Sequence, residues 1–535
     1  MGNSTREQGQ PIGTVAEEVE WQFDAADLRS VRDWMEENIP QNGLSSEPGE
    51  VRLLTDTYFD TADWRLYRAG YALRLRERGK SVEATMKSLE GNGPEIRRRR
   101  EVTESLGSGA VEEVRKAPGL VGERVRFLIG RRVLKPLFVV HTRRTAYAMS
   151  FDGEGVGEVA LDETEFPLEN DADPVTLQRV EFEVRSESTP GIEGFVENLK
   201  VDCGLTPAVS SKYEAGLRIW ELEPPGPPEL GPTGMDASGS AGEAAFAVMR
   251  EQFGVFLSHE GGARIGENPE ELHDMRVAGR RLRAAAIIFD DALPAKTGDL
   301  LEELRYFAGI PGEVRDFDVQ IGQLESWITR ADPEDREPLA ELISLLGERR
   351  EKARRRMLRA FDTGRYRRFV EEFAEFLRQG PSRRQAARRS LVAFAPEQVR
   401  LRYRKMRKAG DGISARSPAE DYHKLRKRSR RLRYALEFLS GVYGKPATKL
   451  IQPLKDLQDV LGGHQDAVVG ASRLRDLRDD GSFDSSPQML FIMGSIHHRY
   501  ETLASERRGR FPKVYDEVTG KRWKKLDRTM RKSAS

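Results

Sequence analysis

The sequence predicts two domains of different fold class, an α+β domain built mainly of antiparallel strands and an all-helical domain built of two related halves. Up to about residue 220, short runs alternate apolar and polar residues, which is typical of strands. After residue 243 the segments are long, charged and helix-periodic. Within them an 11-residue segment occurs twice, as HDMRVAGRRLR from position 273 and as HKLRKRSRRLR from position 423. A repeat at an offset of 150 residues without slippage indicates two related bundles.

Length and composition set the domain boundaries. A chain of 535 residues is too long for one hydrophobic core, and a segment rich in proline and glycine, 221–242, separates the two parts. We therefore expect domains at 15–220 and 243–515, followed by a frayed basic tail at 516–535. No run of 18 apolar residues and no signal-like start is present, which predicts a cytoplasmic protein without a membrane segment. The single cysteine, Cys203, excludes an internal disulfide and a thiolate metal site.

The net charge of zero hides an asymmetry between the two parts. Residues 1–222 contain 29 basic and 40 acidic side chains, and the rest of the chain contains 58 and 47. An acidic first domain is thus joined to a basic second domain, which predicts two different roles and a polyanionic partner for the second.

The first domain is predicted to contain six clear strands and two helices. The strand-like runs are VEWQF, YALRLRER, SVEATMKSL, LFVVHTRRTAYAM, GEVALDETEF and QRVEFEVR, and the helical segments are 25–38 and 190–203. Because alternate residues of a strand share a face, Glu18 points the same way as Glu20, and Glu181 the same way as Glu183. Carboxylate oxygens on two such strands suit a hard divalent cation, Mg²⁺ or Mn²⁺.

Basic residues alternate in the same manner on the intervening strands. They are Arg52, Arg74, Arg76, Lys87, Arg98, Arg100, Arg143 and Lys212. For one strand, outward-facing surface charge would explain the pattern. For the set it does not, because Leu73 and Leu75 take the other face, as expected of an apolar outer wall. A closed sheet with a ring of cations beside an acidic face suits a phosphate chain bridged by metal.

The first domain resembles the CYTH domain, the fold of the triphosphate tunnel metalloenzymes. The matching segments, in order, are EVEWQF, DTYFDT, ALRLRER, TMK, RRREVTE, HTRR, ALDETEF, RVEFEV and SSKYE. The resemblance implies an eight-stranded antiparallel β-tunnel that hydrolyses a triphosphate with a divalent metal. It implies metal binding by Glu18, Glu20, Glu181 and Glu183, with Asp162 a further acidic tunnel residue, and phosphate binding by the basic residues named above.

Two positions depart from the family pattern. The opening motif of the family is ExExK, and this chain has Gln22 at the position of the lysine; His141 replaces a lysine in a later strand. The family lysine is thought to position or activate water, so the candidate catalytic residues are Gln22, Lys87 and Asp162. A neutral Gln22 predicts slow or lost turnover with binding retained.

The second domain is predicted to consist of amphipathic helices over 243–259, 268–291, 298–328, 334–361, 364–379, 395–408, 417–441, 446–477 and 487–509. On the two repeated segments, one imidazole and three guanidinium groups fall within about an 80° arc of the helix. We call these the two rails: His273, Arg276, Arg280 and Arg283, and His423, Arg426, Arg430 and Arg433. The planar fork of arginine suits bidentate contacts to phosphate. Asp316 and Asp466, at the same offset, are expected to fix these side chains.

The repeated segments, with GIPGEVRDFDV and LKDLQDVLGGHQDAVV, resemble the CHAD domain, an α-helical module with conserved histidines. The resemblance implies two pseudo-symmetric four-helix bundles across a basic groove that binds inorganic polyphosphate. The leading hypothesis is a protein that binds and hydrolyses a triphosphate end in the tunnel and holds polyphosphate on the rails. A protein that binds without turnover is the alternative. Nucleic acid is disfavoured because the helical region lacks interleaved aromatic residues, and nothing indicates a base pocket for cyclisation of ATP.

Overall fold

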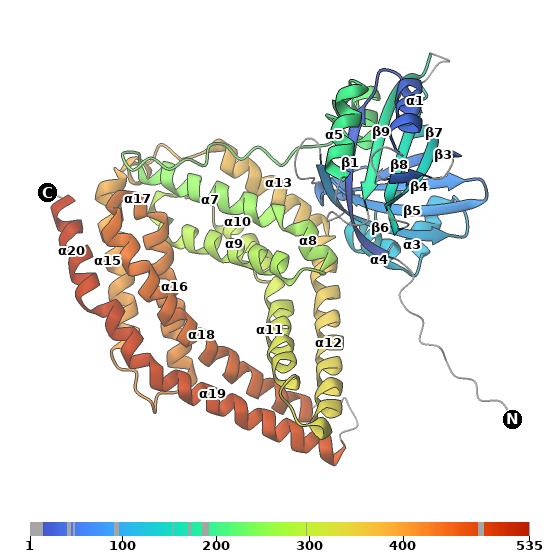
Figure 1. Cartoon of the computed structure of the whole chain (residues 1–535). Helices are drawn as coiled ribbons and strands as arrows, with labels where there is room; N and C mark the ends of the chain where they lie inside the picture. The colour runs from blue at the N-terminus through green and yellow to red at the C-terminus, as the bar shows by residue number, and fades with distance from the viewer. Residues whose placement is uncertain are drawn as a thin grey trace. The chain divides into compact units, whose positions relative to one another are not determined.

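The computed structural model describes residues 14–39, 44–46, 49–89, 96–151, 154–168, 173–184, 192–295, 297–479 and 486–533, with the backbone alone at 14–18 and 533. The chain divides into two compact units, residues 1–227 and 228–535 (Figure 1). The predicted fold class is confirmed, because the first unit is a closed antiparallel barrel with a few helices and the second is helical.

Eight of the described strands form the barrel of the first unit. In spatial order they are β1 (Thr14–Asp24), β6 (Ile96–Leu106), β5 (Ser81–Ser88), β4 (Tyr71–Arg78), β3 (Glu50–Thr61), β7 (Leu134–Phe151), β8 (Glu154–Phe166) and β9 (Val175–Val184). The barrel closes because β1 pairs with β6 through residues 14–21 and with β9 through residues 19–24. Two short strands, β2 (Leu44–Ser46) and β10 (Thr206–Pro207), extend β7 and β1. Closure leaves every strand with an inner and an outer face.

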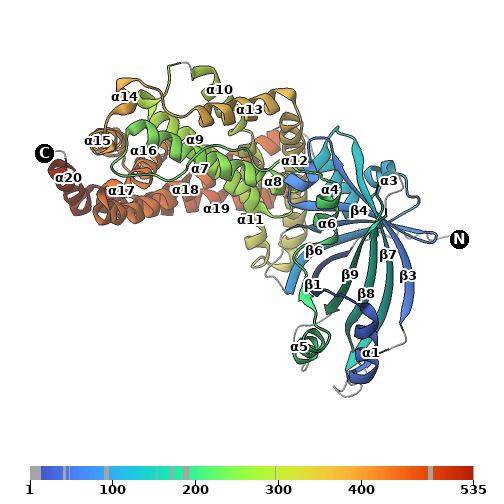
Figure 2. The same cartoon turned by 90° about the horizontal axis from the view of Figure 1, so that it is seen from above.

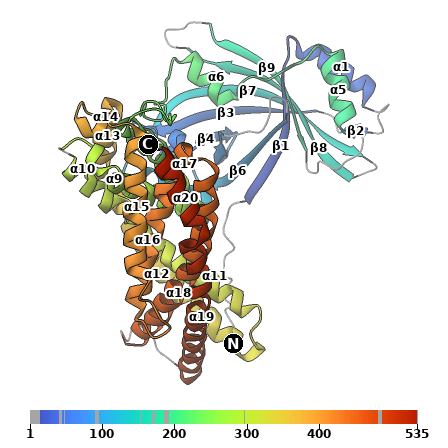
Figure 3. The ribbon, with the colours of Figure 1, turned by 90° about the vertical axis from the view of Figure 1, so that its left-hand side faces the viewer.

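The outer face of β1, β8 and β9 is apolar and lies under two helices. α1 (Leu28–Asn38) and α5 (Ile192–Asp202) lie beside each other at one end of the strands (Figures 2 and 3). Trp21 stacks on Phe182 at 5.9 Å between ring centroids, and Phe182 meets Phe195 of α5 edge to face. This apolar layer fixes the parity of the strands, so the alternate residues, which are polar, point into the barrel.

The remaining helices of this unit cover other parts of the barrel. They are α2 (Arg65–Arg68), α3 (Val111–Lys116), α4 (Leu120–Ile129) and α6 (Lys212–Ile219). α6 begins with a capping box between Ser211 and Glu214 and packs Tyr213 against Tyr58 and Phe138. A Cβ atom on Gly216 would lie 2.2 Å from the Phe138 ring, so only glycine permits this approach. α6 thereby carries Lys212 to the barrel interior.

The second unit repeats the same helices at the predicted offset. The first half contains α7 (Ala241–Ser258), α9 (Pro269–Ile288), α11 (Pro311–Ile328) and α12 (Pro333–Phe361), and the second contains α15 (Leu391–Gly410), α16 (Ala419–Phe438), α18 (Lys445–Asp479) and α19 (Pro487–Thr519). In each half these four pack in sequence. Shorter elements join them: α8 (Glu260–Ile265), η2 (Asp290–Ala292), α10 (Gly298–Phe307), α13 (Gly364–Gln379), α14 (Gln385–Arg388) and α17 (Ser440–Tyr443).

The halves meet where the first helix of each begins. Ser240 and Ser390, which precede α7 and α15 and are 150 residues apart, form an antiparallel bridge. Ala241 N donates to Arg389 O at 2.8 Å and Leu391 N donates to Gly239 O at 2.9 Å. The two bonds are equivalent under the repeat, which places a pseudo-twofold axis between the two helix starts.

Two expectations for this unit are wrong. The segment 298–328 is two helices, α10 and α11, because Pro311 lacks an N–H and disfavours helix at the residue before it. The repeat has Leu461 at this position, and α18 runs through it unbroken. The basic tail is not frayed, since α20 (Lys521–Ser533) buries Leu526 and Met530. Among the described helices none is both long and apolar enough to cross a membrane.

Candidate functional site

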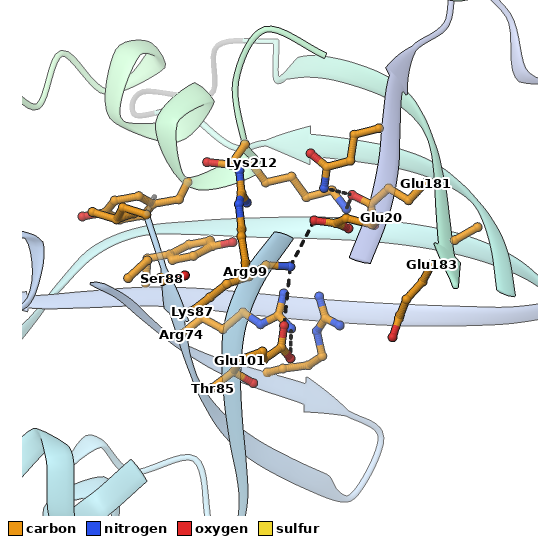
Figure 4. A pocket seen from close by; sticks show the side chains of 18 of the residues that line it. Glu20, Arg74, Thr85, Lys87, Ser88, Arg99, Glu101, Glu181, Glu183 and Lys212 are labelled. Atoms are coloured by element: carbon orange, nitrogen blue, oxygen red, sulfur yellow. Dashed lines mark hydrogen bonds and ion pairs between the residues drawn. The ribbon is translucent and has the colours of Figure 1, made fainter. Parts of the chain in front are cut away.

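The interior of the barrel holds a cavity of about 150 Å³ (Figure 4). Among the described side chains six cations and five carboxylates line it: Arg74, Arg76, Lys87, Arg99, Arg144 and Lys212, and Glu20, Glu101, Glu158, Glu181 and Glu183. Gln22, Thr85, Ser211, Tyr58 and Tyr213 are among the other lining residues. The strands contribute mainly alternate residues to the lining. The charged side chains therefore lie in the cavity because the apolar residues between them form the outer wall.

Two of the cations are held by a carboxylate behind the cavity wall. Arg76 binds both oxygens of Asp56, at 2.7 Å each, and Arg74 lies 3.8 Å from the same group. Burial alone would raise the pKa of Asp56, but Arg76 and Arg74 lower it to about 2. Asp56 therefore stays ionised and orients both guanidinium groups toward the cavity.

A second buried group joins three strands and a helix. Arg144 of β7 donates to both oxygens of Asp162 on β8, at 2.8 and 2.7 Å, and also to Glu181 on β9. Lys212 of α6 donates to Asp162 and, at 3.0 Å, to Glu181. Burial would raise the pKa of Glu181, but Lys212 and Arg144 hold it well below its ordinary value. Glu181 is therefore an anion already matched by two cations.

Lys87 lies between two carboxylates near the middle of the cavity. Its Nζ is 3.3 Å from Glu20 Oε1 and 3.5 Å from Glu101 Oε2 (Figure 4). Burial would raise the pKa of Glu101, but Lys87 and Arg74 lower it. Lys87 can thus exchange a carboxylate for a phosphate oxygen without losing its charge partner entirely.

Glu183 differs from the other interior carboxylates. No hydrogen bond or ion pair joins it to another described side chain, and Figure 4 shows it apart from Lys212. Burial raises its pKa, and the neighbouring carboxylates Glu101, Glu20 and Glu158 raise it further. Mutual repulsion among oxygen donors is relieved by a divalent cation, so Glu183 and Glu20 fit a metal by donor chemistry. The described side chains do not, however, bring three or more acidic, histidine or cysteine groups together as a ready-made metal site.

Gln22 occupies the same interior face. Its side chain is 4% exposed, and its Nε2 donates to Glu181 Oε1 at 3.4 Å. Its Oε1 is buried and has no hydrogen-bond partner among the described atoms. A buried acceptor of this kind fits a water or a ligand hydroxyl.

The strand register corrects three expected interior residues. Arg98 and Arg100 lie on the exposed outer face of β6, and Arg143 pairs with Glu163 outside the barrel at 3.2 Å. Their neighbours Arg99 and Arg144 point inward instead. The other expected tunnel residues Glu20, Gln22, Arg74, Arg76, Lys87, Glu181, Glu183 and Lys212 line the cavity. The Glu18 side chain lies outside the described residues.

Two expected site residues lie beside the cavity rather than in its wall. Arg52 of β3 donates to Glu158 at 3.2 Å and to Glu50 at 2.9 Å. Asp162 is fully buried between Arg144 and Lys212. Because Asp162 accepts hydrogen bonds from both cations and does not reach the cavity, the geometry suits it for positioning those cations.

In the second unit the two rails face each other where α9 packs on α16. Burial, together with the neighbouring Arg426 and Arg280, lowers the pKa of Arg430 to about 10. Burial also lowers the pKa of Arg276, where Asp316 opposes and Arg280 and Arg426 add to the effect. The Nε of Arg280 is buried without a hydrogen-bond partner among the described atoms. Four guanidinium groups from two helices thus crowd one place, which favours an anion there.

Asp316 and the rail histidines frame this cluster. Arg276 Nη2 donates to Asp316 Oδ1 at 3.0 Å, and Arg473 donates to the Asp316 carbonyl at 2.8 Å. His423 Nδ1 lies 2.7 Å from Gln465 Oε1. Burial lowers the pKa of His273 and of His423, with further lowering by Arg315 and Lys427 respectively. Burial raises the pKa of Asp466, although Arg426 opposes it.

Comparison with known proteins agrees with both units. Residues 33–214 match the family model of the CYTH domain, and residues 247–475 match that of the CHAD domain. The chain is a CYTH domain followed by a CHAD domain. An uncharacterized protein of Mycobacterium tuberculosis is 24% identical over 511 residues, which cover 91% of this chain and 92% of that protein.

Solved structures resemble each domain separately. The CHAD domain from the plant Ricinus communis is 24% identical, with 56% of this chain and 97% of that chain covered and a TM-score of 0.46. A putative adenylyl cyclase from Hippeastrum, described as having a dominant triphosphatase activity, is 18% identical, with 39% of this chain and 98% of that chain covered and a TM-score of 0.29.

Sequence reasoning missed four charged residues of the CYTH cavity, Arg99, Glu101, Arg144 and Glu158. In the run RRRREV the arginines alone do not define which face is inner. Val102 does define the inner face. Because an apolar residue belongs to the outer wall, Arg98 and Arg100, which share its face, lie outside, whereas Arg99 and Glu101 lie inside. In VVHTRRT two valines and two arginines are each adjacent, so this run contains no such signal.

Proposed function

We propose that the CYTH domain binds the triphosphate end of a phosphate chain together with a divalent cation and hydrolyses it, and that the CHAD domain holds inorganic polyphosphate on its two rails. The observation that carries the first part is the convergence of six cations of the described residues around one cavity inside the barrel. Fixed cations of this density suit the oxygens of a phosphate chain, whose transfer reactions depend on positioning and charge stabilisation.

The charge balance of the cavity supports the metal requirement. The six cations face five lining carboxylates, and Asp56 and Asp162 lie directly behind the wall. Among described side chains the interior is therefore close to neutral and cannot by itself compensate a triphosphate. Glu20 and Glu183 would hold the cation. When bound, it would neutralise charge on the phosphate oxygens and make the phosphorus more electrophilic.

The protein side chains then have separate roles in hydrolysis. Arg74, Arg76 and Arg99 would contact the phosphate oxygens, and Lys87 would move from Glu20 to a phosphate. Gln22 Oε1 would accept a hydrogen bond from the attacking water. The water oxygen bonds to the terminal phosphorus, the bridging P–O bond breaks, and orthophosphate and pyrophosphate leave, with the water proton passing to bulk or product. Arg144 and Lys212 would keep Glu181 ionised and would hold Glu181 and Asp162 in place.

A second function, binding without turnover, is favoured by the neutral Gln22. An amide can orient water but adds no positive charge and no base. The rate lost by removing a general base or acid is about 10²–10⁴-fold. In that case the CYTH domain would capture a phosphate end and the CHAD domain would extend the contact along the chain.

Phosphate release separates the two functions. The full chain is incubated with tripolyphosphate, longer polyphosphate, and nucleoside and thiamine triphosphates, with Mg²⁺ or Mn²⁺. Hydrolysis predicts metal-dependent release from at least one substrate, and Gln22→Lys raises it with little change in affinity. If the natural protein is already fast and the substitution slows it, Gln22 is a working replacement for the lysine. Absence of release from every substrate, with binding retained, establishes the second function.

A further inference from the structure

The two rails of the CHAD domain end differently. One turn beyond its last arginine, the α16 rail continues to Glu437, whereas the equivalent position on α9 is Ile287. Ile287 is 43% exposed, an unusual position for a large aliphatic side chain in a charged helix face. The repeat is thus broken at the one position where each rail reaches the end of its helix.

Glu437 neutralises its own end of the groove. Arg433 Nη1 donates to Glu437 Oε1 at 2.8 Å, and Arg281 of the facing helix donates to Glu437 Oε2 at 2.5 Å. Arg433 Nε also donates to Gln458 at 2.9 Å. The third arginine of the α16 rail is therefore already paired within the protein through Nη1 and Nε, and a phosphate that binds Nη1 would have to displace the carboxylate.

At the other end no described carboxylate forms an ion pair with the rail cations; Asp290 and Asp291, which follow Ile287 in the sequence, act on the pKa of Arg402 instead. By the repeat, Arg431 corresponds to Arg281 and lies toward Ile287, next to Arg283. Burial and the neighbouring Arg305 lower the pKa of Arg283, and burial, Arg428 and Arg283 lower that of Arg431. In the part of the chain that the structure describes, Arg283, Arg305, Arg428 and Arg431 form no ion pair. This end is a cluster of cations without ion-pair partners among the described side chains, contributed by three helices, α9, α10 and α16.

We propose that a polyphosphate chain occupies the groove off-centre, running from the shared central arginines out over Arg283 and Arg431 and stopping at Glu437. The inference rests on the proposed function, that polyphosphate binds the rails. It adds that the pseudo-twofold symmetry of the fold is broken in the ligand site. Glu437 acts as a built-in anion that takes the place of a phosphate, so one end of the groove is closed to the polymer and the other is open.

Two substitutions at equivalent positions test this directly. Glu437→Gln removes the built-in anion while keeping the size of the side chain. Ile287→Glu installs the equivalent carboxylate at the open end, on an exposed position where folding is little affected. Arg283→Gln and Arg281→Gln form a second pair, in which equal charge is removed from an open and a closed position. All are made in the full chain.

Binding of a long polyphosphate of defined length is measured in EDTA over a range of salt, so that any contribution of the CYTH domain is the same in every variant. Each phosphate contact contributes about 0.7 to the slope of log affinity against log salt for a flexible polyanion. We expect Glu437→Gln to raise the affinity roughly tenfold and to steepen the slope by about one contact or more. Ile287→Glu is expected to lower the affinity by a similar factor and to flatten the slope. Arg283→Gln should weaken binding more than Arg281→Gln.

The outcomes separate the inference from the proposed function. Polyphosphate binding that is equally insensitive to Glu437→Gln and Ile287→Glu, or that is weakened equally by the two arginine substitutions, overturns the off-centre site and leaves the rails as the binding surface. No binding by the natural protein overturns both. Because Glu437→Gln leaves two arginines without their partner, its folding is checked by thermal melting, and Ile287→Glu alone suffices if that variant is unstable.

Discussion

At the scale of single residues, the decisive feature of the CYTH cavity is that neighbours in the sequence face opposite sides of the barrel wall. Arg98 is exposed and Arg99 lines the cavity, with its Nε buried and without a partner among the described atoms. We expect Arg99→Gln to weaken triphosphate binding about tenfold to a hundredfold, since a hydrogen bond to a charged group contributes about 1.5–3 kcal/mol. Arg98→Gln, which removes the same charge one residue away, should leave the affinity within a factor of two or so. Equal losses in a calorimetric titration would mean that net charge, not the interior site, governs binding.

The rail histidines lead to a pH dependence. Both have pKa values below their ordinary 6.5, so both are neutral at pH 7 and gain a proton only as the pH falls below 6.5. The charged groups that influence them are Glu270, Asp274, Arg280 and Arg315 for His273, and Arg426, Lys427 and Arg430 for His423. Polyphosphate affinity should therefore be flat from pH 8 to 6.5 and rise below that. The double variant His273→Gln with His423→Gln should lose the rise. If the polyphosphate affinity has already finished rising at pH 7, a group other than these two histidines is responsible for the pH dependence.

Which residues face the cavity was only partly predictable from the sequence. Leu73 and Leu75 identify the outer face of their strand, and the structure places Arg74 and Arg76 inside. The matching signal for β6 was the single Val102, and the run of four arginines obscured it. The engagement of Glu181 by Arg144 and Lys212 could not be predicted at all, because it depends on which strands become neighbours when the barrel closes.

At the scale of elements, the long helices and strands follow from periodicity, whereas short elements depend on local chemistry. The serine and glutamate of SSKYE form a capping box, a signal of a helix start that the strand interpretation overlooked, and α6 rather than a strand supplies Lys212. Pro311 divides one helix of the first half, and its repeat partner Leu461 does not. The rails, by contrast, could be predicted from the helical period alone, because it places their side chains within about an 80° arc.

The facing of α9 and α16 determines how the rails should respond to substitution. The two central arginines of one rail make few contacts with a phosphate chain. When both rails are part of one fold, the second rail meets a chain bound to the first at high effective concentration. Arg276→Gln with Arg280→Gln, or Arg426→Gln with Arg430→Gln, should then weaken long-chain polyphosphate binding nearly as much as all four together. The control is Arg404→Gln with Lys405→Gln on the exposed face of α15, which removes equal charge. Independent, additive losses, or equally tight binding of duplex DNA of matched charge, would contradict a shared polyphosphate groove.

At the scale of the whole molecule, the 150-residue repeat and the charge asymmetry predicted two domains with different ligands of one chemical class. The offset of 150 residues is kept without error at the bridge between Ser240 and Ser390. Duplicated helices keep their spacing when the turns that join them keep their length. What the sequence could not indicate is that the CYTH interior is nearly neutral. Its charges pair across strands, and only the closed barrel shows how many cations are already matched.

Because the interior is nearly neutral, the cavity alone cannot compensate the negative charge of a triphosphate. The central claim is therefore that a divalent cation is required for binding. The most direct measurement is calorimetric titration of the full chain with tripolyphosphate in Mg²⁺ and again in EDTA, beside the variant Glu20→Gln with Glu183→Gln. We predict strong binding in Mg²⁺ that falls at least about tenfold in EDTA, and a variant whose affinity no longer depends on the metal. Equal affinity for tripolyphosphate with and without the metal in the natural protein would contradict the account.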